Sequence, residues 1–281
     1  MTNFTIVEGF FIQHEPDAIP TEIGALPPRL GLKNDTADRW KALENCLAEL
    51  NASDEAAYKL IYLCRHGQGY QYVKQTTLPK QTFAPRQAYW STLNGDDELT
   101  WGPDPLLTPL GESQALDARK AFQAENSAGI LLPQKCFASP LRRALDTWKI
   151  TFNGGDEEAV LEGEKRTVLI LENCREEYGI HTCDLRSPLS SLRALYPPPT
   201  YTFEPSFTEE DPVWRKDERE TKAHVAERAR SVLEVVFAGP ETVVAITAHG
   251  GFINGVLEAV GRRHYALPTG GILPVVVKYT K

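Results

Sequence analysis

Residues 59–69 read KLIYLCRHGQG, a short apolar run that ends abruptly in arginine, histidine and glycine. The block from Leu60 to Cys64 is apolar almost throughout, which is typical of a strand covered on both faces inside a mostly parallel sheet. Arg65 and His66 cannot continue that block, so we expect them at the carboxyl end of the strand, where open α/β sheets bind ligands. The glycines at 67 and 69 have no Cβ and allow a sharp turn and a close approach to a ligand.

A second stretch, KCFASPLRRALDTW, repeats this transition from an apolar strand to charged residues. Residues 136–138 are typical of a strand, Ser139 can cap a helix, and Pro140 suits its first position. Arg142 and Arg143 would then lie in the opening turn, where positive charge opposes the helix dipole. Two arginines there are easier to explain if they face an anion together with the free amides of the helix.

A third transition occurs in TVVAITAHGGFINGVL, where residues 243–247 predict another buried strand. His249 follows that strand and precedes two glycines, and a helix is expected from Phe252. A lone histidine in such a turn is usually structural, but here three strand ends carry charged or titratable groups. Because strands alternate with helices, the sheet should be parallel, and its carboxyl edge should bring the three ends together.

The remaining pattern predicts further elements around this sheet. Helices are expected after a cap at Asp35 or Thr36, after a cap at Thr108, and over 215–237. Residues 272–279 read as a closing strand.

Composition and charge limit the kinds of partner. The chain has 281 residues and a net charge of −8, which argues against a general binder of nucleic acid or membrane surfaces. We find no signal peptide and no run of membrane-spanning length, so a cytoplasmic or nuclear location is expected. The five cysteines and six histidines are too scattered for a metal site. We expect reduced thiols and neither metal nor cofactor.

The three transitions resemble successive signatures of a known family. The RHG of Arg65, His66 and Gly67, the SPLRRALDT around Arg143, and the AHGGFINGVL around His249 are similar to motifs of the histidine phosphatase superfamily, also called phosphoglycerate mutase-like. A single RHG would be weak evidence. Several motifs in the right order make a chance similarity improbable.

Two further segments resemble the phosphomutase-like proteins of fungi and plants. They are WGPDPLLTPLGESQA at 101–115 and CREEYGIHTCDLR at 174–186. The resemblance implies an α/β fold, a three-layer α/β/α sandwich with a mostly parallel central sheet. We expect an N-terminal extension at 1–57 that packs on the core. A catalytic domain should follow at 58–281, with inserted loops at about 70–105 and 180–215.

The resemblance also implies roles for individual residues. His66 takes the place of a nucleophile that forms a phosphohistidine. Arg65, Arg143 and His249 would stabilise the charge of the transferring phosphoryl group, with His249 also counted as catalytic. Glu176, in the motif R-E-x-x-G, takes the place of the acid that protonates the leaving alcohol, and a nearby phosphate should raise the pKa of its carboxyl.

Other residues of these segments are candidates for substrate contact beyond the phosphate. They are Gln68, Tyr72, His181, Asp184 and Arg186. A hydrogen-bonded turn would explain His181, Asp184 and Arg186 equally well. Glu177 is expected to be solvated.

The segment after RHG departs from the fungal pattern RHGQGxHN, because this chain reads RHGQGYQY. Gln71 and Tyr72 stand where histidine and asparagine are expected. A tyrosine hydroxyl can still donate a hydrogen bond, but its ring needs different space. The change points to a specialised substrate, or to a fold redeployed for another reaction on an anionic metabolite.

We therefore expect a metal-independent phosphohydrolase that acts on a small phosphorylated metabolite through phosphohistidine. A phosphomutase is one alternative, although return of the phosphoryl group requires exclusion of water that no motif demonstrates. A noncatalytic binding protein is another, but it would not need the combined set of catalytic residues. The oligomeric state stays open.

Overall fold

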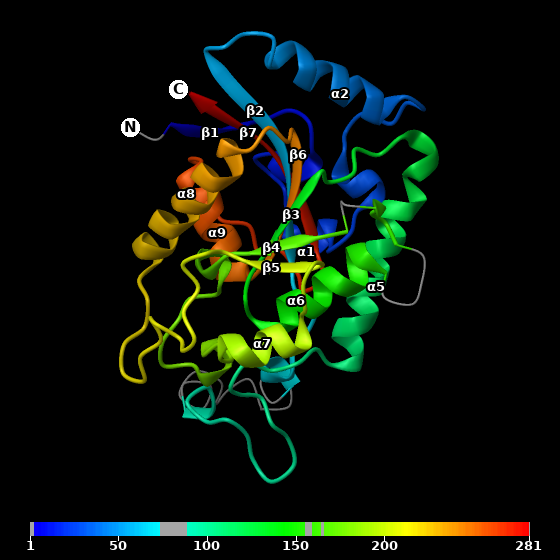
Figure 1. Cartoon of the computed structure of the whole chain (residues 1–281). Helices are drawn as coiled ribbons and strands as arrows, with labels where there is room; N and C mark the ends of the chain where they lie inside the picture. Colours follow the sequence, from blue (N-terminus) through cyan, green and yellow to red (C-terminus); the bar gives the residue numbers. More distant parts are fainter. Residues whose placement is uncertain (1–2, 74–88, 155–158, 164–165, 281) are drawn as a thin grey trace.

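The structure is a computed structural model that describes residues 3–73, 89–154, 159–163 and 166–280. Within these residues, seven strands form one sheet in the order β1-β7-β2-β6-β3-β4-β5 (Figure 1). The strands are β1 Phe4–Val7, β2 Ala56–Arg65, β3 Lys135–Ala138, β4 Val168–Ile170, β5 Tyr201–Phe203, β6 Val243–Ala248 and β7 Ile272–Thr280.

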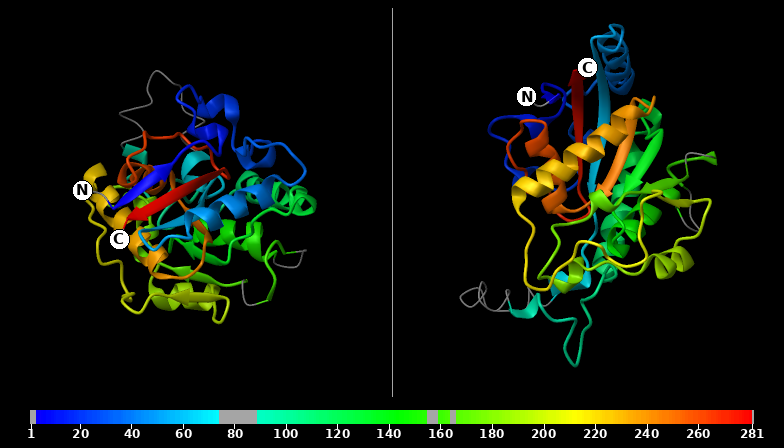
Figure 2. Two further views of the ribbon diagram at one scale, coloured as in Figure 1. Left: turned by 90° about the horizontal axis from the view of Figure 1, so that it is seen from above. Right: turned by 60° about the vertical axis from the view of Figure 1, so that its left-hand side comes forward.

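Most neighbouring strands in the sheet run parallel. The pairs β2–β6, β6–β3, β3–β4 and β4–β5 are parallel, whereas β7 is antiparallel to both β1 and β2. The N-terminal strand β1 lies at the edge beside β7, so the two ends of the chain meet at one end of the molecule (Figure 2).

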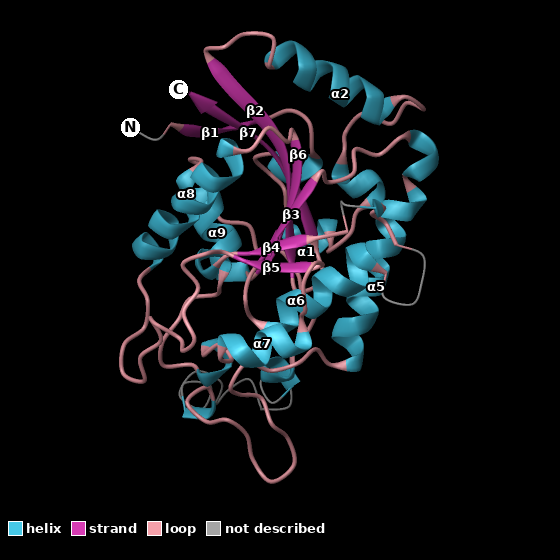
Figure 3. Ribbon diagram, viewed as in Figure 1, coloured by secondary structure: helices cyan, strands magenta, loops and turns pink. Residues whose placement is uncertain are grey.

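Helices cover both faces of the sheet, as the sequence predicts (Figure 3). Alternate residues of β2 explain this, since Leu60 and Tyr62 join one apolar cluster and Ile61 and Leu63 join another. Helices α2, α5 and α6 cover the first face, and α8 and α9 cover the second. The helices are α1 Pro20–Ile23, α2 Arg39–Leu50, α5 Pro109–Ala124, α6 Arg142–Trp148, α7 Leu189–Leu195, α8 Lys222–Ala238 and α9 Gly250–Ala259. The three-layer α/β/α prediction is confirmed.

Two helix starts differ from the prediction. The cap expected at Asp35 or Thr36 is wrong, because the amide and hydroxyl of Thr36 both bond to Asn34, and α2 begins only at Arg39. The helix expected over 215–237 begins at Lys222 instead, since the preceding residues pair with another loop through backbone hydrogen bonds.

The start of α6 has a remote cap in place of the expected local one. Ser139 is not its N-cap, because the hydroxyl accepts a hydrogen bond from Leu141 and lies against His249. The carboxylate of Asp104 accepts the amide of Arg142 at 2.8 Å instead. Other boundaries agree more closely with the sequence. Thr108 caps α5 as predicted, α9 begins two residues before the expected Phe252, and β7 ends one residue beyond 279.

The first predicted insertion, about 70–105, lies partly outside the described residues, which omit 74–88. Its remainder includes a turn at Tyr70–Tyr72 and a loop from 89 to 107. The second, 180–215, contains a turn at Thr182–Asp184, helix α7 and strand β5. All five cysteines are free thiols. In the described part of the chain, we find no helix with the length and apolarity to cross a membrane and no cluster of metal-ligating side chains.

Candidate active site

The three charged strand ends meet at one edge of the sheet. Arg65 is the last residue of β2, and it lies opposite Ala248, the last residue of β6. His66 and His249 follow directly, and the amide of His66 donates to the carbonyl of Ala248 at 3.0 Å. Arg143 enters from the first turn of α6, just after β3. The parallel register therefore brings together four of the residues that the sequence places at strand ends: Arg65, His66, Arg143 and His249.

The imidazole of His66 is held in one tautomer. Its Nδ1 lies 2.6 Å from the carbonyl oxygen of Gly67, and because a carbonyl can only accept, Nδ1 must carry the hydrogen. Nε2 is then the atom with the lone pair, and it has no hydrogen-bond partner among the residues that the structure describes. Burial, together with Arg143 and Arg65, holds the pKa of His66 well below its usual value. The ring is therefore neutral and can act as a nucleophile through Nε2.

The turn after His66 is fixed by the start of α5. A Cβ on Gly67 would lie 2.2 Å from the carbonyl oxygen of Gly111, so the close approach at this glycine is to backbone. The amide of Gly67 donates to the hydroxyl of Thr147 at 3.0 Å. Gln68 is also tied to α5, because its side-chain oxygen accepts the hydroxyl of Thr108 at 3.0 Å. Gln68 therefore anchors the turn, and these contacts hold the carbonyl that orients His66.

Arg65 is shared between backbone and Tyr72. One terminal nitrogen donates to the carbonyl of Leu267 at 2.6 Å, and the other donates to the hydroxyl of Tyr72 at 2.9 Å. The ring of Tyr72 also stacks on His66, with centroids 6.1 Å apart and planes 23° apart. The residue that departs from the fungal pattern thus lies inside the site. Gln71, the other departure, is buried with no partner for its Oε1 among the described residues.

Arg143 is buried and faces the same centre. Its terminal nitrogens donate to the carbonyl of Cys183 at 2.7 Å and to Oδ1 of Asp184 at 2.9 Å. Burial opposes the charge, but the neighbouring Asp184 keeps the pKa of Arg143 above its usual value. Its guanidinium therefore stays charged at the centre of the site.

His249 is the second imidazole at the centre. Its ring centroid lies 4.8 Å from that of His66, and its Nε2 lies 2.7 Å from the hydroxyl oxygen of Ser139. Burial and the neighbouring Arg143 hold its pKa well below the usual value. Sequence reasoning assigned Ser139 only to a helix cap. No periodic signal marks a residue that is 110 positions away from its partner.

A shared feature of these four side chains is a buried nitrogen with no hydrogen-bond partner among the described residues. Buried polar groups without partners are costly, so such a cluster indicates a place for a ligand. The two guanidinium nitrogens can only donate, and they favour a ligand that carries negative charge. The four atoms are Arg65 Nε, His66 Nε2, Arg143 Nε and His249 Nδ1.

The side chain of Glu176 packs against the start of α9, near these four residues. Its Oε2 accepts the amide of Gly251 at 3.2 Å, and a Cβ on Gly251 would lie 2.1 Å from Oε1. Burial, then the negative charge of Asp184, raises the pKa of the Glu176 carboxyl. The pKa of Glu176 is therefore raised, as expected, even without a nearby phosphate. The neighbouring Glu177 was expected to be solvated, but its side chain is only 13% exposed and pairs with Lys222.

The three candidates of the branch-specific segment differ in position. Asp184 is buried and points to Arg143, and Nδ1 of the half-buried His181 lies 3.9 Å from Oδ2 of Asp184. Arg186 is directed elsewhere, because its Nε pairs with Glu172 and its other donors bind carbonyls of residues 187 and 208–210. The structure therefore brings Asp184 into contact with the site and leaves Arg186 in a neighbouring network.

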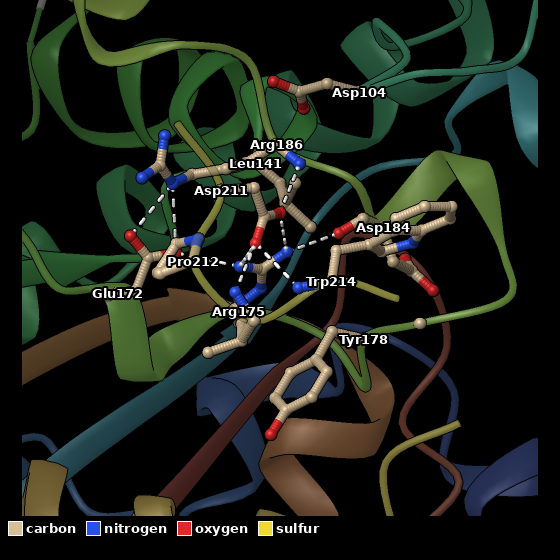
Figure 4. Close-up of polar contacts among 12 residues, drawn as sticks. Asp104, Leu141, Glu172, Arg175, Tyr178, Asp184, Arg186, Asp211, Pro212 and Trp214 are labelled. Carbon is tan, nitrogen blue, oxygen red and sulfur yellow. Dashed lines mark hydrogen bonds and ion pairs between the residues drawn. The ribbon is translucent and has the colours of Figure 1, made fainter. Parts of the chain in front are cut away.

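That network supports the loops that carry the acid and Asp184 (Figure 4). Arg175 donates to both oxygens of Asp211, to Glu172 at 2.9 Å and to the carbonyl of Asp184 at 2.6 Å. From α8, Arg228 donates to the carbonyls of residues 173, 175 and 176. Sequence reasoning missed Arg228, although a charged residue within the inner apolar stripe of that helix is a usable signal.

Comparison with known proteins gives a consistent result. The family model of the histidine phosphatase superfamily (branch 1) matches residues 61–269. The chain is 32% identical to a probable phosphoglycerate mutase of Arthroderma benhamiae, over 98% of this chain and 84% of that protein. It is also 32% identical to phosphomutase-like protein 3 of Candida albicans, over 99% and 80% of the two chains.

A mycobacterial glucosyl-3-phosphoglycerate phosphatase, solved in complex with VO3, aligns with 72% of this chain and 79% of its own length. The identity is 20% and the TM-score is 0.40. The family model matches most of the chain, and the fungal relatives match nearly all of it. Together with the arginines and histidines at the strand ends, these matches show that the chain belongs to the histidine phosphatase superfamily.

Proposed function

We propose that this protein is a metal-independent phosphohydrolase that cleaves a small phosphorylated metabolite through a phosphohistidine at His66. The observation that carries the proposal is that four side chains at this edge of the sheet each keep a buried nitrogen that lacks a partner among the described residues. One of them, Nε2 of His66, has its lone pair free because Nδ1 is bonded to Gly67. A nucleophile beside donors for several oxygens is the arrangement that attack on a phosphate monoester requires.

In the first proposed step, Nε2 of His66 attacks phosphorus and the bond from phosphorus to the ester oxygen breaks. The bond between Nδ1–H and the Gly67 carbonyl stabilises the positive charge that develops on the ring. Glu176, whose raised pKa favours the protonated acid, gives its proton to the departing alcohol. The products of this step are the free alcohol, a phosphorylated His66 and an ionised Glu176.

In the second proposed step, the Glu176 carboxylate takes a proton from a water molecule as that water attacks phosphorus. The bond between phosphorus and Nε2 breaks, inorganic phosphate leaves, and His66 and Glu176 return to their initial states. Arg65 and Arg143 supply fixed positive charge that magnesium ions supply in many other phosphoryl-transfer sites. The proposed reaction therefore needs no metal ion.

Tyr72 supports a specialised substrate over a general phosphatase. Its ring stacks on His66 and its hydroxyl accepts a hydrogen bond from Arg65, so the side chain occupies space beside the nucleophile. Of the other residues expected to touch the substrate, His181 and Gln68 are partly accessible, and Gln68 is tied to Thr108. We propose that Tyr72 forms an aromatic wall against the part of the substrate that carries the phosphate.

Three alternative functions remain distinct in their products. A phosphomutase would return the phosphoryl group to another position of the substrate and release no inorganic phosphate. A binding protein would retain phosphate affinity without turnover, and a redeployed fold would convert an anionic metabolite without releasing phosphate. The names of the two fungal relatives given above are the specific reason to test the mutase reaction.

The first prediction concerns the nucleophile. In His66→Ala, release of inorganic phosphate from a panel of phosphorylated metabolites should fall by a factor on the order of 10⁴ or more, because no other group can form the covalent intermediate. His264→Ala, which changes an exposed histidine, serves as the control and should keep full activity. Thermal denaturation checks that both variants fold. Phosphate release at the wild-type rate by folded His66→Ala would refute the mechanism.

The second prediction separates the acid from the other groups. Glu176→Gln should reduce kcat/KM for alkyl phosphates by about 10²- to 10⁴-fold. The loss should be smaller for p-nitrophenyl phosphate, because p-nitrophenolate leaves without protonation. In the wild type, the lowered pKa of His66 favours the neutral nucleophile in weakly acidic solution, and the raised pKa of Glu176 favours the protonated acid.

The profile of kcat/KM against pH should therefore have its maximum on the acidic side of neutrality and fall as rising pH ionises Glu176. In Glu176→Gln this fall on the basic side should disappear for alkyl phosphates. Equal losses for both kinds of leaving group, with an unchanged pH profile, would exclude Glu176 as the acid.

The third prediction concerns Tyr72. Tyr72→Asn should raise kcat/KM for p-nitrophenyl phosphate by up to about 10²-fold, because asparagine supplies a compact donor and opens space beside His66. It should weaken turnover of the preferred metabolite, which loses the aromatic wall. Tyr72→Phe is the matched control, since it keeps the ring and removes only the hydroxyl. Kinetics unchanged for both substrate classes would remove Tyr72 from the substrate site.

A further inference from the structure

Arg143 is held by a segment that is distant in sequence. Both of its terminal nitrogens are occupied, one by the carbonyl of Cys183 and the other by Oδ1 of Asp184. The side chains of Arg143 and Asp184 are only 2% and 4% exposed, so water does not compete for these bonds. A guanidinium fixed at two terminal nitrogens cannot rotate about its long axis, which leaves its third nitrogen, Nε, in a defined direction.

Asp184 is itself held from its other side. Its Oδ2 accepts a hydrogen bond from Arg219 at 2.9 Å, so one carboxylate bridges two guanidinium groups. If Asp184 paired with Arg143 alone, it would neutralise the charge that an anion needs. Two cations share this carboxylate, so Asp184 neutralises Arg143 only in part. The other neighbouring carboxylate, Glu177, lies 3.9 Å from Nε of Arg219 and is itself paired with Lys222.

The backbone beside Asp184 is forced into an unusual shape. Gly179 has a φ of +84°, and a Cβ there would lie 1.7 Å from the carbonyl oxygen of Glu218. Ile180, a β-branched residue, has a φ of +58° and donates its amide to Arg215 at 2.8 Å. Strain of this kind persists where the surroundings impose it, often at functional sites. Here the strained turn directs the carbonyl of Gly179 to Arg219 at 2.9 Å.

We propose that Asp184 and Arg219 form a positioning pair that holds the guanidinium of Arg143 in the orientation that receives the phosphoryl group. The inference rests on the function proposed above and deepens it. It replaces the expectation that Asp184 touches the substrate, because both carboxylate oxygens are occupied by protein donors and the residue is buried. Asp184 has a second effect, since its negative charge contributes to the raised pKa of Glu176.

Three single variants test the pair. Asp184→Asn keeps the shape and removes the charge, and should lower kcat/KM about 10- to 100-fold through misplacement of Arg143. Arg219→Gln should lower kcat/KM in the same direction, and Arg219→Lys should recover part of the loss because it restores the charge. In Asp184→Asn the basic side of the pH profile should also move to lower pH, because Glu176 loses a neighbouring negative charge.

A double-mutant cycle shows whether Asp184 acts through Arg143. The cycle is measured on the acidic side of the profile, where Glu176 stays protonated in every variant. In an Arg143→Ala background, Asp184→Asn should change kcat/KM by less than about twofold, because its target is already absent. If Asp184 had a purely structural role, Asp184→Asn would lower kcat/KM in the Arg143→Ala background by as much as it does alone. It would also lower the thermal midpoint without moving the pH profile.

The outcomes separate this inference from the proposed function. If the wild type hydrolyses phosphate esters but Asp184→Asn and Arg219→Gln keep its kcat/KM and pH profile, the positioning pair is refuted and the function stands. If the wild type releases no phosphate from any ester, the function is refuted. Vanadate binding by calorimetry then tests the pair, which predicts weaker binding in both variants. Should Asp184→Asn fail to fold, Arg219→Gln gives the same test, since the Arg219 side chain is 26% exposed.

Discussion

The guanidinium groups of Arg65 and Arg143 and the imidazoles of His66 and His249 lie together at the carboxyl edge of the sheet, and each keeps one buried nitrogen without a partner among the described residues. Buried cations normally find a counter-charge inside the protein. Here the pairing is incomplete, because within the described ranges Arg65 bonds only to neutral oxygens and Arg143 shares Asp184 with Arg219. This incomplete neutralisation supports the proposed anion site, and burial together with the arginine charges lowers the pKa of His66 and His249. The rest of the fold keeps these charges in place.

The support comes from loops that the sheet does not order by itself. Arg228 binds the carbonyls of the segment that carries Glu176, and Arg175 binds the carbonyl of Asp184. At the start of α9, the amide of Gly251 donates to the carboxyl group of Glu176. On the other side, Gly111 of α5 packs directly against Gly67 and fixes the carbonyl that orients His66. Each group of the proposed mechanism is thus held by at least one residue that never meets the substrate.

The sequence predicted the parts of this arrangement that leave a local or periodic trace. Apolar runs located β2 and β6, and the residues that end each run located Arg65, His66 and His249. The cap of α6 could not be found in this way, because Asp104 reaches Arg142 from a remote loop. The partner of Asp184 could not be found either. Arg219 was expected inside the helix over 215–237, whereas the observed helix begins three residues after it, at Lys222. Long-range polar contacts depend on loop paths, which no spacing rule encodes.

The central claim is that His66 carries the phosphoryl group during turnover, and trapping that group tests it most directly. Glu176→Gln should accumulate the intermediate from p-nitrophenyl phosphate, because the leaving group needs no acid while the attacking water has lost its base. After rapid denaturation in alkali, digestion and mass spectrometry should find one phosphoryl group, labile in acid, on the peptide that contains His66. A burst of p-nitrophenol with no modified peptide, or with the phosphoryl group on another residue, would contradict the account.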